Sequence, residues 1–141
     1  MSRIRSKNTK PELIVRKYLF SKGYRYRLHV KKLPGCPDIV MSKHKLAIQV
    51  RGCFWHGHHC KLGSAPKSNR SYWSNKIKLN RKRDKKNDRK LKYLKYKLFV
   101  IRECDLKKDK YKKKRIQIKI IKLQNNRLFD TKSVLFLLIC F

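Results

Sequence analysis

The run from Gly52 to Cys60, GCFWHGHHC, constrains this chain more than any other segment of its sequence. It holds two cysteines and three histidines, and thiolate and imidazole are the ligands that zinc prefers. Because a structural zinc site needs four ligands in a tetrahedron, a fourth has to come from another element, and Cys104 lies at the end of a predicted strand. We therefore expect a metal site that ties a loop to a distant strand.

The spacing within this run does not select the histidine ligand, so His56, His58 and His59 all remain candidates. Buried free cysteines beside loop histidines are the alternative interpretation. The chain has five cysteines, an odd number, and its opening residues show no apolar segment typical of a secretory signal. Both features favour a reducing, intracellular compartment, where clustered cysteines hold metal more often than they form disulfides.

Lysine and arginine number 41 against 8 acids, which gives a formal net charge of +33. This balance makes a polyanion the natural partner, with nucleic acid as the leading candidate, and it disfavours an ordinary neutral metabolic enzyme. A hydrophobic content of 40% also excludes a wholly disordered basic tail. The longest apolar run, Val134 to Phe141, is far shorter than the roughly 20 residues that span a bilayer, so we expect no membrane partner.

The hydrophobic pattern predicts a single α/β domain. Thr9 and Glu12 have the spacing of a capping box, and Gly23 suits the C-terminal cap of a helix that reaches about Lys22. Alternating and continuous apolar runs predict the remaining elements. The expected strands are 24–30, 38–41, 46–50 and 98–101, and the expected second helix is 71–95. The resulting order, α-β-β-β-α-β, predicts a mixed α/β layer.

Asp38 follows Pro37 at the start of a predicted strand, and Gln49 and Arg51 lie on the next one. The arrangement resembles the PD-(D/E)-x-K pattern of restriction-type nucleases, in which the turn-borne acid anchors magnesium and metal-bound water supplies the nucleophile. The second acid and the lysine of that pattern are missing here. An ordinary aspartate in a Pro-Gly turn is therefore an equally good interpretation.

Asp84 lies in the middle of the predicted second helix, on the face that also carries Trp73 and Leu91. An apolar stripe interrupted by polar residues suggests that the centre of the helix faces a polar site. The alternative is a surface charge that balances Arg81 or nearby lysines.

Glu12 is first a helix cap, with a functional role left open. Solvated charges or caps are the interpretation for three further acids, Asp88, Asp105 and Asp109.

The second helix also carries the chain's densest positive charge. Residues 76–97 hold twelve basic side chains against two acids, which favours phosphate neutralisation over a merely solvated face.

Phe54 and Trp55 lie beside the expected metal sites. They could cover the zinc site, or they could wedge between base pairs and unstack them.

Six segments, in unbroken order over about residues 2 to 106, resemble the Vsr family of very short patch repair DNA mismatch endonucleases. They read RSKNTKPE, YRYRLHV, LPGCPDIV, GCFWHGHHC, the N-x-x-R-D of Asn80 to Asp84, and VIREC. The resemblance implies a restriction-endonuclease-like mixed central sheet flanked by helices, with a structural zinc site. It also implies an enzyme that nicks DNA 5′ to the thymine of a T:G mismatch left by deamination of 5-methylcytosine.

The resemblance further implies a magnesium-dependent hydrolysis by activated water, which leaves a 5′-phosphate and a 3′-hydroxyl. Asp38 would ligate magnesium with help from the Val50 carbonyl. His56 would act as the general base or as a hydrogen-bond partner of the attacking water. Asp84 and Glu12 would orient magnesium-bound waters or the histidine.

The same resemblance assigns the remaining site residues. The zinc ligands would be Cys53, His58, Cys60 and Cys104, which selects His58 among the three histidines. Phe54 and Trp55, with the N-terminal segment around Met1, would form the wedge that intercalates into DNA. Arg51 departs from the family pattern, because the best-known members carry a second active-site histidine at this position. Arg51 could still contact phosphate, but it cannot serve as an acid or base.

These expectations define residues 1–109 as a Vsr-like endonuclease domain and residues 110–141 as a basic, then apolar extension with no assigned structure. The expected partners are double-stranded DNA with a T:G mismatch and, by family analogy, mismatch-repair proteins. The expected state is a monomer in the bacterial cytoplasm that acts at the nucleoid. Two alternatives remain open: a zinc-stabilised basic nucleic-acid-binding protein without catalysis, and a related nuclease with a different DNA substrate.

Overall fold

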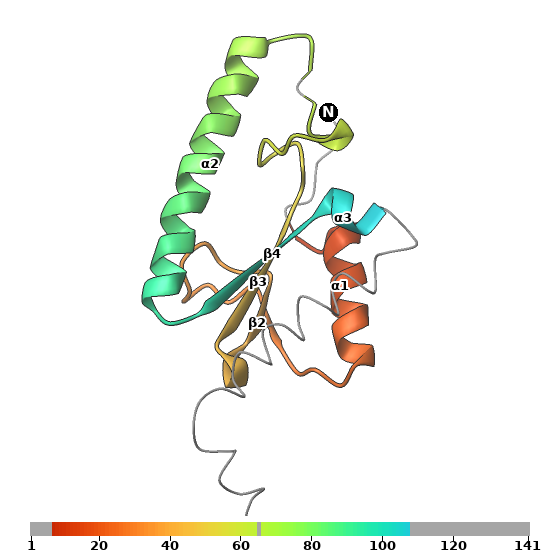
Figure 1. Ribbon diagram of the computed structural model, residues 1–141, viewed down its shortest axis with the longest axis vertical. Helices are drawn as coiled ribbons and strands as arrows, with labels where there is room; N and C mark the ends of the chain where they lie inside the picture. Colours follow the sequence, from red (N-terminus) through yellow and green to blue (C-terminus); the bar gives the residue numbers. More distant parts are fainter. Residues whose placement is uncertain (1–6, 65, 108–141) are drawn as a thin grey trace, which may run out of the picture.

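A computed structural model describes residues 7–64 and 66–107 of the chain (Figure 1). The elements in chain order are α1 (Lys10–Ser21), β1 (Arg27–Leu28), β2 (Ile39–Met41), η1 (Ser42–His44), β3 (Leu46–Arg51), η2 (Lys61–Gly63), α2 (Arg70–Tyr93), β4 (Lys97–Arg102) and α3 (Glu103–Lys107). The expected order α-β-β-β-α-β is confirmed, with two short 3₁₀ turns and α3 in addition. The predictions for Met1 and for residues 110–141 lie outside the described residues.

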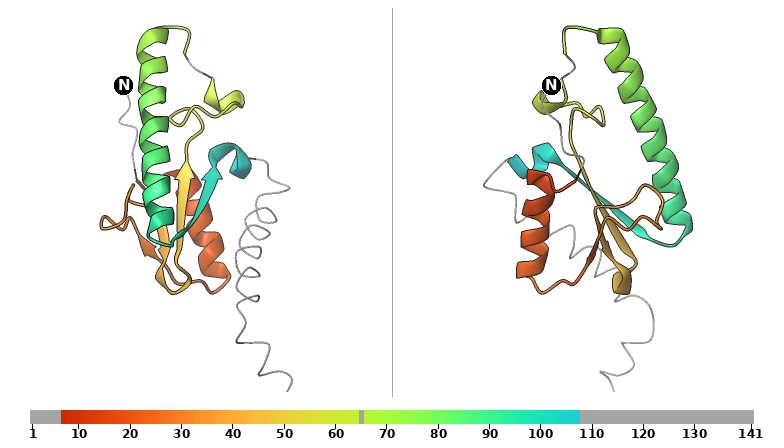
Figure 2. Two further views of the ribbon diagram at one scale, coloured as in Figure 1. Left: turned by 60° about the vertical axis from the view of Figure 1, so that its left-hand side comes forward. Right: turned by 180° about the vertical axis from the view of Figure 1, so that it is seen from behind.

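The strands form one mixed sheet in the order β1-β2-β3-β4. β1 pairs with β2, and β2 with β3, in antiparallel orientation, whereas β3 and β4 are parallel. α1 and α2 lie on opposite sides of this sheet (Figure 1, Figure 2). The expected class, a mixed central sheet flanked by helices, is therefore confirmed. Within the described part of the chain, no helix is both long enough and apolar enough to cross a membrane.

The ends of α1 form where the sequence predicts them. The hydroxyl of Thr9 donates to Glu12 Oε1 at 3.0 Å, and the hydroxyl oxygen accepts the Glu12 N–H at 3.5 Å. At the other end Gly23 takes a φ of +78°, and the N–H of Tyr24 donates to the carbonyl of Leu19. This pairing is the Schellman motif that favours glycine after a helix.

The first strand differs from its prediction. Alternation predicts a half-buried strand over 24–30, but the structure pairs only Arg27 and Leu28 with β2. Leu28, expected to face the core, is 42% exposed. The strand ends at this point because His29 adopts a left-handed φ of +45°, which breaks the extended backbone. The left-handed turn also redirects the His29 side chain, with consequences for the site.

The core lies between α1 and the sheet. Its largest fully buried side chains come from α1, β2 and β3, and α3 closes one end with Leu106. The fully buried set includes Leu19, Ile39, Met41 and Ile48. Each such side chain contributes about 1.5–3 kcal/mol relative to an exposed one. This packing holds β3 rigidly, and β3 is the strand that leads into the Cys/His run.

Parallel pairing places the carboxyl ends of β3 and β4 at one edge of the sheet. Arg51 and Arg102 are register partners there, so the chain leaves both strands side by side. Cys53 follows β3, and Cys104 lies in the first turn of α3 rather than at the end of a strand. The topology therefore brings the loop and the distant cysteine together.

Candidate active site

Four sulfur and nitrogen donors meet at this edge of the sheet. The ligating atoms of Cys53, His58, Cys60 and Cys104 all lie within 4.8 Å of one another. Cys104 Sγ is 3.5 Å from His58 Nδ1, and the Cys104 N–H donates to Cys53 Sγ at 3.4 Å. His56 and His59 do not belong to the cluster. Three thiols and one imidazole in a tight group fit a tetrahedral zinc ion, and they are the same four residues that the family resemblance selects.

Two glycines allow the loop to fold this tightly. A side chain at Gly63 would lie 1.8 Å from the carbonyl oxygen of His58, so only glycine fits there. Gly57 turns the backbone with a φ of +60° and lies against Ile77 of α2.

Burial raises the pKa of the Cys53 thiol to about 12. Without a metal, Cys53 therefore remains a neutral thiol, and metal binding has to release its proton.

A second cluster lies on the other side of β3. The ligating atoms of Glu12, His29 and Asp38 also lie within 4.8 Å of one another. Asp38 Oδ2 accepts the Val50 N–H at 2.7 Å, which fixes the carboxylate against β3. Two carboxylates within reach of one point are the oxygen ligands that magnesium prefers, so the donor set fits this ion.

His29 is the member of this cluster that sequence reasoning missed. Its Nε2 lies 2.8 Å from Arg16 Nη2. Because a guanidinium only donates, Nε2 must be the acceptor and the ring proton sits on Nδ1. Nδ1 lies 3.8 Å from Asp38 Oδ1, which is too far for a hydrogen bond, so this contact is electrostatic. The alternating pattern hid His29, because it placed this residue on the solvent face of a strand that ends just before it.

The environment of Asp38 disfavours its charge. Burial raises the pKa of Asp38 above its ordinary value, although the hydrogen bond from the Val50 N–H lowers it. The neighbouring carboxylate of Glu12 raises this pKa further, and the opposing effects of His29 and Arg16 are smaller still. Glu12 is itself only 2% exposed and is held by Arg16 at 2.9 Å. A cation between the two carboxylates would remove their mutual repulsion.

Asp84 faces the site from α2. Its Oδ2 lies 2.5 Å from His56 Nδ1. No residue in the described ranges forms a hydrogen bond with Nε2 of this imidazole, so Nε2 can act on another group. One helical turn earlier, Asn80 donates to the backbone carbonyl of Trp55 at 3.0 Å. α2 therefore holds the loop through two polar side chains. The alternative of a surface charge that balances Arg81 is wrong, because the partner of Asp84 is His56.

One cavity collects the expected catalytic residues. It has a volume of about 740 Å³, and its wall includes Glu12, Asp38, Val50, His56 and Asp84. These residues come from α1, the turn before β2, β3, the loop after it and α2. A helix cap, a turn aspartate and a solvated charge would not be expected to converge on one cavity. The convergence favours the catalytic interpretation of each acid.

Phe54 and Trp55 form an aromatic cluster with Trp73 of α2. The ring centroids are 5.0 to 5.9 Å apart, and each pair meets edge to face. Phe54 and Trp55 are half-buried, and Trp55 also lines the cavity of about 740 Å³. The role of Trp73 as a support for the other two rings was not expected. Whether these rings enter DNA stays a prediction.

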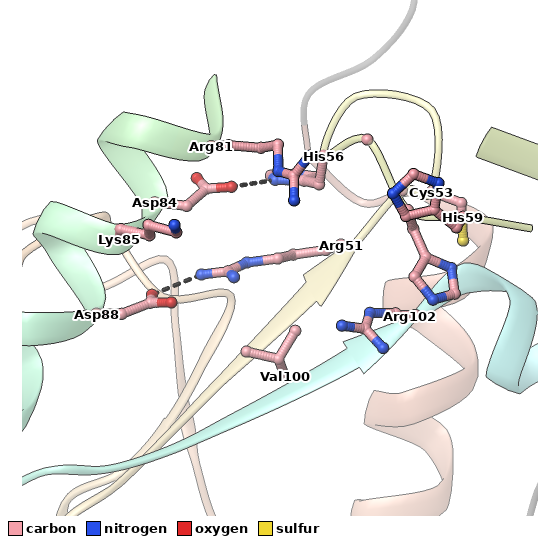
Figure 3. A pocket seen from close by; sticks show the side chains of 13 residues that line it. Arg51, Cys53, His56, His59, Arg81, Asp84, Lys85, Asp88, Val100 and Arg102 are labelled. Atoms are coloured by element: carbon pink, nitrogen blue, oxygen red, sulfur yellow. Dashed lines mark hydrogen bonds and ion pairs between the residues drawn. The ribbon is translucent and has the colours of Figure 1, made fainter. Parts of the chain in front are cut away.

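The prediction for Asp88 is wrong. Rather than a solvated charge, it accepts from Arg51 Nη2 at 2.5 Å, and its side chain is only 22% exposed (Figure 3). Asp88 lies one turn beyond Asp84 and therefore faces the same side of α2. The spacing of four residues between Asp84 and Asp88 was a signal for this contact, since residues four apart on a helix share a face.

The chain is similar to known DNA endonucleases. The family model of the DNA mismatch endonuclease Vsr matches residues 1–62. The type II nicking enzyme V.NmeAIP of Neisseria meningitidis is 50% identical over 107 residues, which are 76% of either chain. V.XorIIP of Xanthomonas oryzae pv. oryzae, another type II nicking enzyme, is 50% identical over 75% of this chain and 78% of its own. The DNA mismatch endonuclease Vsr of Escherichia coli is 33% identical over 76% of this chain and 69% of its own.

We predict that the purified protein carries one zinc ion per chain and unfolds when the ion is removed. Four donors join the loop to α3, so the free energy of metal binding is coupled to the free energy of folding. Elemental analysis and circular dichroism before and after chelation measure both effects. Folded protein without zinc or another thiophilic metal would contradict the ligand assignment.

We also predict that Asp38→Asn stabilises the protein in buffer without magnesium at neutral pH. The folded-state pKa of Asp38 is raised, so its ionisation costs folding free energy above that pKa, and the cost disappears as the pH falls below the ordinary value. Denaturant unfolding of the zinc-loaded protein from pH 5 to 8, where the zinc ligands keep their metal, should show a difference that shrinks toward the acid end. Magnesium should stabilise the parent protein more than the variant, and equal stabilisation of both would contradict a cation site at Asp38.

Proposed function

Because the chain belongs to the Vsr family of DNA mismatch endonucleases and related nicking enzymes, we propose that it nicks one strand of duplex DNA 5′ to the thymine of a T:G mismatch. Membership makes the chain a DNA endonuclease, a hydrolase of phosphodiester bonds, rather than a binding protein without chemistry. The proposed pathway is very short patch repair. The observation that carries the proposal is the convergence of Glu12, Asp38, His56 and Asp84 on one cavity.

The proposed hydrolysis assigns a task to each of these side chains. Asp38, with the Val50 carbonyl, would hold a magnesium ion, which when bound supplies positive charge to the phosphate and lowers the pKa of water. His56 takes the proton of the attacking water on Nε2, because Asp84 occupies Nδ1. Asp84 keeps the ring oriented and stabilises its protonated form. Cleavage of the bond from phosphorus to O3′ leaves a 5′-phosphate and a 3′-hydroxyl.

Zinc has a structural task in this proposal. Cys53, His58, Cys60 and Cys104 would use all four positions of the ion, so none remains for substrate. The ion would fix the loop that carries His56 on one side and the aromatic pair on the other. Its contribution to catalysis is therefore to hold the general base and the wedge in place.

DNA binding is proposed to use the basic face of α2 and the aromatic pair. The exposed lysines and arginines of this helix neutralise phosphates without reading sequence. Phe54 and Trp55 enter a base step next to the mismatch, where unstacking costs least. We further propose that residues 1–109 act as one endonuclease domain and as a monomer in the bacterial cytoplasm, at the nucleoid. Mismatch-repair proteins are proposed as additional partners.

A different DNA substrate is the second candidate. Both relatives at 50% identity carry the name type II nicking enzyme, whereas the E. coli mismatch endonuclease is 33% identical. Arg51 also departs from the family pattern inside the site. These two observations favour a nicking enzyme that prefers another mismatch, or a T:G mismatch within another flanking sequence.

We predict magnesium-dependent nicking of the thymine strand in a labelled T:G duplex and no nicking of the matched G:C duplex. Asp38→Ala should abolish nicking and leave DNA binding intact or stronger, since removal of the carboxylate also lowers repulsion toward phosphate. Gel assays on a panel of mismatches and flanking sequences measure both substrate and context preference. Preferred cleavage of another mismatch would support the second candidate, and near-normal cleavage by Asp38→Ala would place the catalytic centre elsewhere.

We predict that Trp55→Ala weakens binding to the T:G duplex more than binding to the matched duplex. The affinity ratio should shrink by roughly tenfold, since stacking of a base on an aromatic ring is worth about 1–3 kcal/mol. Titrations with both duplexes measure the ratio, and Tyr93→Ala is the control, because Tyr93 is an 85% exposed aromatic on α2 outside the cluster. Equal losses on both duplexes, with unchanged zinc content, would show that other residues read the mismatch.

A further inference from the structure

Arg51 lies between the two metal-binding clusters. It is the last residue of β3 and directly follows Val50, whose N–H holds Asp38. Its side chain is 15% exposed and lies on the same face of the strand as Gln49. Nε and Nη2 of Arg51 both donate to Gln49 Oε1. The guanidinium is therefore held in one orientation from the strand side.

α2 holds the same guanidinium from the opposite side. Asp88 accepts from Arg51 Nη2 at 2.5 Å, one turn beyond the place where Asp84 binds His56 at 2.5 Å (Figure 3). Two carboxylates on one helix face thus each hold one basic side chain of the site. The parallel is chemical as well as spatial, since Asp84 orients the imidazole in the same way that Asp88 orients the guanidinium.

One nitrogen of Arg51 remains open. Among the residues that the structure describes, none accepts a hydrogen bond from Nη1, and Nη1 is not among their buried unpaired atoms. Arg51 lines both the cavity that contains Asp38 and a neighbouring cavity of about 280 Å³. Arg81, Lys85 and Arg102 also line this neighbouring cavity, while its two acids, Asp84 and Asp88, are already paired. The wall of this neighbouring cavity therefore has a net positive charge, which suits an anionic group.

We propose that Arg51 contacts a non-bridging oxygen of the phosphate bound beside Asp38, and that Asp88 is the positioning residue that aims the guanidinium at it. This inference deepens the function proposed above and rests on it. Guanidinium suits the task because it is planar, permanently charged and able to bind carboxylate and phosphate at the same time. Charge that develops on the phosphate in the transition state meets a donor that is already in place.

A positioning role of Asp88 can be distinguished from a purely electrostatic role, because the two roles predict opposite effects of its removal on the nicking rate. If Asp88 acts only as a negative charge, its removal makes the site more attractive to DNA and does not slow nicking. If Asp88 aims Arg51, its removal slows nicking even though DNA binds equally well or more tightly. The split between rate and affinity therefore distinguishes the two.

The experiment compares Asp88→Ala, Asp88→Asn, Arg51→Lys and the double variant Arg51→Lys/Asp88→Ala with the parent protein. Single-turnover nicking gives the rate, and titration without magnesium gives the affinity for the same T:G duplex. Asp88→Ala should lower the rate by about 10- to 100-fold, the scale of a misplaced catalytic contact, with unchanged or tighter binding. Asp88→Asn keeps an acceptor oxygen without the charge, so it should retain more activity than Asp88→Ala.

Arg51→Lys should slow nicking, and Asp88→Ala should add nothing in that background, because Asp88 acts through the guanidinium. Asn75→Lys is the charge-matched control: it adds one positive charge to an exposed position of α2 outside both cavities and should change affinity alone. Zinc content and melting temperature verify the fold of every variant. If Asp88→Ala does not fold, Asp88→Asn and the double variant Arg51→Lys/Asp88→Asn replace it.

A parental rate in Asp88→Ala, or losses that multiply in the double variant, would overturn the inference. A second readout needs no turnover. The side-chain N–H resonance of Arg51, assigned by its loss in Arg51→Lys, should shift when a prenicked T:G duplex with a 5′-phosphate binds, and the shift should collapse in Asp88→Ala. Nicking without this shift overturns the phosphate contact alone. The shift without nicking of any duplex overturns the proposed function and leaves the contact standing.

Discussion

The parallel pairing of β3 with β4 is the constraint on which the site depends. It brings the ends of two strands that lie far apart in sequence to one sheet edge, so Cys53 and Cys104 meet there. The same edge presents Val50, which holds Asp38, and Arg51, which binds Asp88. A metal at the cysteines would lock an arrangement that the backbone pairing has already made. Loop, strand end and helix are therefore positioned by one register, and a slip of one residue would reverse every side chain of β3.

The cavity is built at a cost in stability. Asp38 and Glu12 place two carboxylates side by side in a half-buried site, and both burial and their repulsion raise the pKa of Asp38. α1 offsets part of this cost through Arg16, which binds Glu12 and His29 together. The remainder is what a bound cation would relieve. A site of this kind is less stable empty than filled, and this difference is the physical basis of cation affinity.

Much of the fold was predictable because its signals are local. The capping box at Thr9, the glycine after α1 and the stripe on α2 each depend on residues within one or two turns. What could not be predicted depends on tertiary contacts or on single backbone angles. His29 lies in the site because its backbone adopts a left-handed φ. Arg51 forms its ion pair with Asp88, a residue 37 positions away in the sequence. His58 is identified as the expected zinc ligand by the family resemblance rather than by spacing, because three histidines fit the spacing equally well. For His58 alone, the family resemblance thus supplied what local patterns could not.

The distribution of charge explains why metal and DNA would have to bind together. Against a net charge of +33, five of the eight acids line the two cavities: Glu12, Asp38, Asp84, Asp88 and Glu103. Four of them have basic partners, at Arg16, His56, Arg51 and Lys107. Asp38 has only the weaker electrostatic contact with His29, so it would repel a phosphate most strongly. The basic side chains would attract DNA, but the Asp38 carboxylate would oppose productive binding until a cation neutralises it. Under the proposed function, cation binding and productive DNA binding each strengthen the other by the same factor, because linkage is reciprocal.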